Sequence, residues 1–76
     1  MEKVYLEVTA KHDIEGRVTP LAIKWPNGRL FEIDKVIEAR KAAALKAGGS
    51  GMRYTCKISG KEVLLFCSEG KWFLDM

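Results

Sequence analysis

The residues of this chain best suited to bind another molecule are its cations, and they are unevenly distributed. The 76 residues carry a formal net charge of +3. Residues 35–61 hold seven lysines and arginines against a single acidic residue, Glu38, whereas the segments on either side are slightly acidic. A basic centre between near-neutral ends is typical of a protein that contacts phosphate groups. We therefore expect this segment to face the phosphate backbone of DNA or RNA.

Six residues are candidates for such an interface. Three cations are expected in a basic loop, and two more on the outer face of the strand that follows. An aromatic ring opposite that strand is placed to stack a base. The alternative is that the cations are ordinary solvated charges and that the ring completes a second small apolar cluster. The candidates are Arg40, Lys41 and Lys46 in the loop, Arg53 and Lys57 on the strand, and Phe66 opposite Arg53.

Catalysis, metal binding and cofactor binding are not expected. His12 lies next to Asp13, but no serine or cysteine is evidently placed beside it as a nucleophile. Cys56 and Cys67 are too few for a disulfide-rich scaffold or a zinc site, and we expect them to face inward, where thiols are inert. Gly48-Gly49-Ser50-Gly51 lacks the Gly-Lys-Ser/Thr of a phosphate-binding loop, and we interpret it as a flexible hairpin loop.

Short strands separated by turn residues account for most of the chain. The predicted strands are residues 4–11, 17–25, 29 onward, 53–58, 61–68 and 71–75. A chain of this length forms one domain, residues 1–76, and is too short for an ordinary two-sheet sandwich. We therefore expect an all-β fold, a small SH3-like, strongly bent antiparallel barrel of five to six strands.

Two tight turns predict which side chains face inward. Pro26-Asn27-Gly28 and Ser59-Gly60 are typical hairpin connections. In the second hairpin, Cys56 and Cys67 lie four residues out of step, roughly 13 Å apart, which is too far for a disulfide. The first turn pairs Trp25 with Arg29, Ile23 with Phe31 and Leu21 with Ile33 on one face; the second pairs Cys56 with Val63, Tyr54 with Leu65 and Met52 with Cys67 inside, and Lys57 with Glu62 and Arg53 with Phe66 outside.

The sequence leaves the structure of residues 38–47 open. Ala39–Ala47 is rich in strong helix formers, and Asp34 is a suitable cap for a helix that starts at Lys35. Residues 31–37 are strand-like, however. We favour a third strand that runs to Ala39 or Arg40, followed by a long basic loop with room for a helical turn.

The last predicted strand suggests a different function. Trp72 and Phe73 point to opposite faces, so we expect one of them to be exposed. An exposed aromatic strand, or an open sheet edge, suits docking to a protein partner. The first residues do not form a signal peptide, and no apolar run is long enough for a membrane span, so the expected location is the cytoplasm. The oligomeric state is open.

Five segments, spread over nearly the whole chain, resemble a group of short bacterial proteins without an assigned function. This group is similar to small SH3-like domains that accompany lesion-bypass DNA polymerases. The resemblance implies an SH3-like fold and an association with DNA repair, and it assigns no functional residue. The segments are Pro20–Trp25, Gly28-Arg29, Phe31–Ile37, Ala47–Cys56 and Gly70–Phe73.

Overall fold

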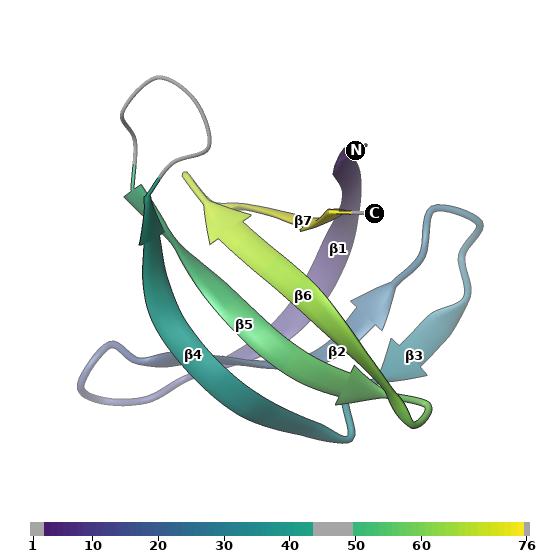
Figure 1. The fold of residues 1–76 in the computed structure, drawn as a ribbon, viewed down its shortest axis with the longest axis horizontal. Helices are drawn as coiled ribbons and strands as arrows, with labels where there is room; N and C mark the ends of the chain where they lie inside the picture. Colours follow the sequence, from purple (N-terminus) through teal and green to yellow (C-terminus); the bar gives the residue numbers. More distant parts are fainter. Residues whose placement is uncertain (1–2, 44–49, 76) are drawn as a thin grey trace.

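A computed structural model describes residues 3–43 and 50–75 of the chain. These residues form antiparallel strands joined by short turns, with no helix among them (Figure 1). The all-β prediction is therefore confirmed, although the strands number seven rather than five or six. The strands are β1 (Lys3–His12), β2 (Val18–Lys24), β3 (Leu30–Glu32), β4 (Lys35–Ala43), β5 (Ser50–Ile58), β6 (Lys61–Ser68) and β7 (Lys71–Asp75).

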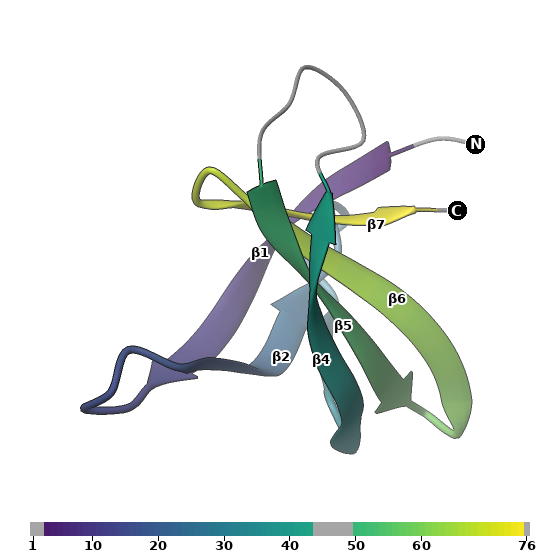
Figure 2. The same cartoon turned by 60° about the vertical axis from the view of Figure 1, so that its left-hand side comes forward.

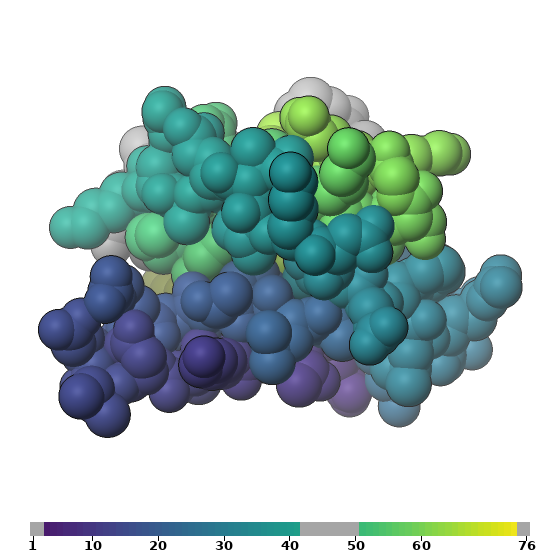
Figure 3. Space-filling view, turned by 90° about the horizontal axis from the view of Figure 1, so that it is seen from below, coloured from purple at the N-terminus to yellow at the C-terminus, as the bar shows by residue number. Residues whose placement is uncertain are grey.

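The strands form one strongly curled sheet in the order β3-β2-β1-β7-β6-β5-β4. β1–β3 and β4–β7 are two consecutive antiparallel meanders, and the pairing of β1 with β7 joins them. The sheet bends into a half-barrel whose edges are β3 and β4 (Figures 1 and 2). Seen from below, β4 and its neighbours lie over the layer made by β1 and β2 (Figure 3). The described residues span 33 × 32 × 19 Å.

Both predicted hairpin registers are confirmed. Tyr54 lies opposite Leu65 and Arg53 opposite Phe66 across the Ser59-Gly60 turn. Both turn residues have positive φ, 51° and 79°, as a type I′ turn requires. In the other hairpin, the Trp25 amide donates to the Arg29 carbonyl at 2.7 Å.

The predicted inward position of Leu21 is wrong, because β2 contains a β-bulge. Thr9 of β1 pairs with Ala22, but the next residue, Ala10, pairs with Pro20, so Leu21 is an extra residue. The bulge places Pro20 in the core and leaves Leu21 45% exposed. A bulge locally changes which side chains face the core, and the alternation of the sequence does not reveal it.

The predicted third strand is in fact two strands. The chain leaves β3 after Glu32, turns at Ile33-Asp34 and continues as β4. The turn is held by the Asp34 amide, which donates to the Lys57 carbonyl at 2.7 Å, and the Asp34 carboxylate accepts from the Gly60 amide at 3.4 Å. Residues 38–43 are strand, neither helix nor loop, whereas residues 44–47 lie outside the described residues.

The second half of the predicted loop Gly48–Gly51 is strand in the structure, since Ser50 and Gly51 are the first two residues of β5. Gly51 packs tightly against β6: a Cβ at this position would lie 2.5 Å from the Cys67 carbonyl oxygen. Gly51 therefore allows the two strands to approach each other.

The core lies on the concave side of the half-barrel. Tyr54 is 3% exposed, and Leu65 and Cys56 are completely buried. Cys56 and Cys67 are free thiols, and their register is the one predicted. The core cluster consists of Ile23, Tyr54, Cys56, Ile58, Leu65 and Leu74.

Candidate nucleic-acid interface

One row of side chains crosses five neighbouring strands on the outer, convex face of the sheet. The residues of this outer row are directly paired across the strands: Tyr5 with Phe73, Phe73 with Phe66, Phe66 with Arg53, and Arg53 with Arg40. Alternation along each strand places all five on the face opposite the core. The outer row is aromatic over β1, β7 and β6 and cationic over β5 and β4.

The aromatic half of the outer row forms a second apolar cluster. The rings of Phe66 and Phe73 are stacked, with centroids 5.2 Å apart. The ring of Tyr5, which lies on β1 at the other side of β7, has its centroid 5.4 Å from that of Phe73. The ammonium group of Lys3 lies 5.0 Å from the centre of the Phe73 ring. Such a cluster holds β1, β7 and β6 together from outside.

This cluster leaves Phe66 little area to offer to a base, because the ring is only 9% exposed. Its position agrees with the alternative that Phe66 completes an outer apolar cluster. The prediction that Trp72 or Phe73 is exposed is wrong, because Phe73 is 5% exposed and Trp72 is half-buried against Tyr54. β7 lies inside the sheet, where both of its faces are covered.

The cationic half contains two pairs of like charges between β4 and β5. Arg40 lies directly opposite Arg53, and Lys35 directly opposite Lys57, on the same outer face. We call these four residues the cationic pairs. The two pairs are four residues apart on β5, roughly 13 Å. Like charges that face each other across a sheet repel and destabilise it.

Acidic residues on the outer face compensate part of this repulsion, since Lys57 also lies directly opposite Glu62 of β6. Arg40 donates to the Glu38 carboxylate at 2.9 Å, but both side chains are about half exposed. Arg53, Lys35 and Lys57 make no ion pair with any described residue. The Nε of Arg53 is buried and has no hydrogen-bond partner among the described residues, so this donor of the guanidinium is unused.

The structure places one other predicted cation, Lys41, on the opposite face of β4. Lys41 lies opposite Met52, whose side of β5 is the concave side, so it points away from Arg40 and Arg53. Lys41 therefore does not share a face with Arg40 and Arg53, because consecutive residues of a strand face opposite sides. Lys46 lies outside the described residues.

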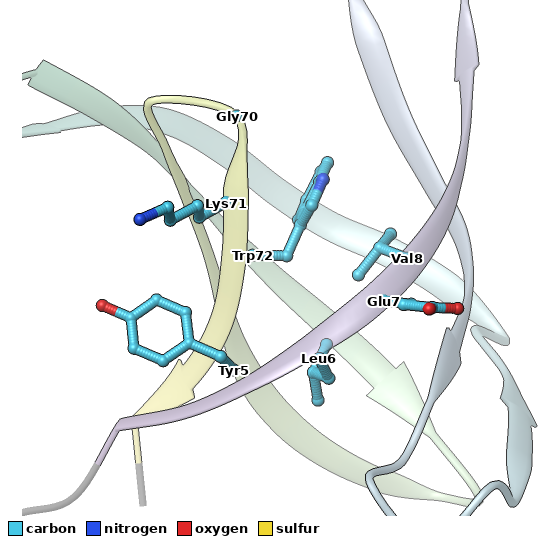
Figure 4. A pocket seen from close by; sticks show the side chains of 7 residues that line it. All are labelled: Tyr5, Leu6, Glu7, Val8, Gly70, Lys71 and Trp72. Atoms are coloured by element: carbon cyan, nitrogen blue, oxygen red, sulfur yellow. The ribbon is translucent and has the colours of Figure 1, made fainter.

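Described residues line two of the grooves on the surface. The first, of about 740 Å³, lies where β1 leaves β7 to pair with β2. Figure 4 shows Trp72 in this gap, with Tyr5 and Lys71 on the opposite side of β7. The second, of about 400 Å³, lies between the β2–β3 and β5–β6 hairpins, which are neighbours in Figure 1; we call it the hairpin groove.

The thiols are poor candidates for chemistry. Burial raises the pKa of Cys56 to about 11 and raises the pKa of Cys67 above its ordinary value. Because the thiolate is the reactive form, both groups are largely unreactive at neutral pH. Among the described residues, no group of three or more His, Cys, Asp or Glu side chains lies together as metal ligands would.

Comparison with protein-family models, curated proteins and solved structures found no match to this chain. The resemblance to SH3-like domains beside lesion-bypass polymerases therefore stays a prediction. None of the described residues form a helix that could span a membrane.

Sequence reasoning found Arg40, Arg53 and Lys57 but missed Lys35, the partner of Lys57. The missing signal was the break in the chain at Asp34, which turns Lys35 into the first residue of β4. Together the four cations lie on one face of β4 and β5, where Phe66, the neighbouring aromatic ring, is almost completely buried.

Proposed function

We propose that the chain is a nucleic-acid-binding accessory module, in which the outer face of β4 and β5 binds the phosphate backbone. The observation that carries this proposal is the cross-strand register, which sets Arg40 directly opposite Arg53 and Lys35 directly opposite Lys57. A phosphate between two such cations removes their repulsion and forms charge-assisted hydrogen bonds with both. The resemblance to domains beside lesion-bypass polymerases adds a proposed role in DNA repair.

Binding through these cations is independent of sequence. Phosphate contacts position a protein on a nucleic acid but do not distinguish its bases. The affinity should fall steeply with salt, because each neutralised phosphate releases counterions. The cationic pairs lie at the edge strand β4, which is open to a long ligand on one side.

The experiment is a fluorescence-anisotropy titration with labelled short single- and double-stranded DNA and single-stranded RNA, at about 50 and about 200 mM salt. The variant R40T/K57T removes one cation from each pair, and threonine keeps the strand propensity. We expect weaker binding and a salt slope smaller by about 1.4 for single strands, since each contact contributes about 0.7.

The matched control is R17T/K24T, which also removes one arginine and one lysine. Arg17 lies in the β1–β2 turn and Lys24 on β2, both exposed and remote from β4 along the sheet. This variant should bind like the wild type. Absence of binding at low salt, or equal losses in both double variants, would contradict the proposal.

The second candidate function is a protein-interaction module that accepts a strand at the edge of β4. Its support is that, among the described strands, the nine residues of β4 pair with β5 and with no other. The β-bulge at Ile37 and the charges of β4 act against it, because both are devices that protect an edge strand from pairing. Binding of a protein partner that resists salt and is unchanged in R40T/K57T would favour this function.

A further inference from the structure

The hairpin groove has the composition of a binding site for a flat apolar group attached to an anion. Trp25 and Phe31 of the β2–β3 hairpin line it on one side, and the remaining apolar lining consists of Ile23, Ile58, Val63 and Leu74. Its volume, about 400 Å³, lies in the range of small-molecule sites. Half-buried aromatic side chains at a concave surface are suited to stacking.

The charged lining of the groove is entirely positive. Arg29 and Lys61, both exposed, are the charged residues that line it, and no acidic side chain does. The guanidinium of Arg29 lies 5.7 Å from the centre of the Phe31 ring, so a cation stands next to an aromatic face. Ser59 and Asn27 add polar groups at the edge. This charge pattern fits a ligand with a negative backbone.

The groove opens on the concave side of the sheet, and the tip of the β5–β6 hairpin separates it from the proposed phosphate surface on the convex face. Lys57 of the cationic pairs precedes Ile58, which lines the groove, and Lys61 lies directly opposite Ile58. A backbone held by Lys35 and Lys57 on the outer face would have to pass around this hairpin tip to place a base in the groove.

We propose that the hairpin groove binds one unstacked base of a single-stranded nucleic acid whose backbone lies on the cationic pairs. This inference rests on the proposed function. A base would stack on Trp25 or Phe31, while Arg29 and Lys61 hold the adjoining phosphates. Because every base has a stacking face, the site favours single strands over duplexes and tolerates different sequences.

The test compares a thymidine hexamer with an abasic hexamer, which has the same backbone charge and no bases. The protein is W72F, which keeps Trp25 as its single tryptophan. We expect both oligomers to bind, the thymidine hexamer about 5- to 150-fold more tightly, as one stacked base provides. Only the thymidine hexamer should quench the fluorescence of Trp25.

A second variant, R29T, makes the test independent of tryptophan. Arg29 is exposed at the β2–β3 hairpin, so its removal leaves the core intact. R29T should reduce the preference for the thymidine hexamer, whereas K11T, which removes an exposed cation of β1, should keep it.

Three results would overturn the inference, and they differ in meaning. Equal affinity for the two hexamers with unchanged Trp25 fluorescence refutes the base site and leaves the phosphate surface standing. Absence of binding by both hexamers at low salt refutes the proposed function together with the base site. Quenching by an acidic, aromatic peptide but not by the thymidine hexamer would assign the groove to a protein partner.

Discussion

Replacement of Lys35 by glutamate should stabilise the fold while weakening nucleic-acid binding. Lys35 faces Lys57 and, at the edge of the sheet, has no other cross-strand neighbour. K35E replaces a repulsion by an attraction, and each is worth a few tenths of a kcal/mol. Glu38, the next acidic residue on this face of β4, opposes part of the gain. We therefore expect the free energy of unfolding to rise by about 0.5 kcal/mol.

The assay is thermal unfolding followed by circular dichroism at low and high salt. For a domain of this size, the gain raises Tm by about 2–4 °C at low salt. The gain should shrink at high salt, because exposed charges are screened. In a K57Q background, K35E should no longer raise Tm. The four proteins (wild type, K35E, K57Q and the double variant) form a double-mutant cycle, which isolates the interaction between these two positions.

The matched control is K24E, which makes the same charge change on β2. Lys24 lies directly opposite Glu7, so the substitution creates a repulsion where an attraction exists. K24E should lower Tm and leave nucleic-acid binding nearly unchanged, although the net charge of the two variants is identical. If K35E has the same effect on stability in the wild-type and K57Q backgrounds, the like-charge argument is refuted.

Three further predictions concern the fold. G51A should lose about 1–3 kcal/mol in urea unfolding, because its Cβ would meet the Cys67 carbonyl at 2.5 Å; an unchanged midpoint would contradict this close approach. F73A should lose about 3 kcal/mol in the same assay, since Phe73 is 5% exposed between Phe66 and Tyr5, and a loss below about 1 kcal/mol would show that the outer cluster is loosely packed. The buried thiol of Cys56 makes stability depend on alkaline pH: its pKa is 9.0 in an unfolded chain and about 11 in the fold, so its contribution is complete below pH 9.0 and is lost as the pH rises to about 11. The loss is at most about 3 kcal/mol, and C56A should show a flatter decline over this range; parallel curves for C56A and the wild type would exclude Cys56 as the cause.

Local turn chemistry made half of the fold predictable. Ser59-Gly60 and Pro26-Asn27-Gly28 each determine a register over the strands beside them, and both registers are found in the structure. The inward positions of Tyr54 and Leu65 follow directly from the first of these turns. Such information lies within a few residues of the turn, where sequence patterns are reliable.

The errors arise where distant strands meet. The bulges at Leu21 and Ile37 depend on the partner strand, and neither disturbs the pattern of its own segment. Phe66 and Phe73 are covered because β1 pairs with β7, a contact between the two ends of the described chain. Lys41 is predicted in a loop, in which no alternation applies, whereas the structure places it in β4, where it faces the side opposite Arg40.

The pairing of β1 with β7 also has a consequence for folding kinetics. β1 and β7 lie at the two ends of the described chain, so their pairing closes a loop that contains all the other strands. Closing so long a loop costs much conformational entropy, and we therefore expect β1 and β7 to pair late, after the local hairpins have formed. The outer row runs through both strands and exists only when that step is complete. Any molecule held by the whole row therefore recognises the native state alone, and its binding should slow unfolding and raise the melting temperature in proportion to the logarithm of its concentration.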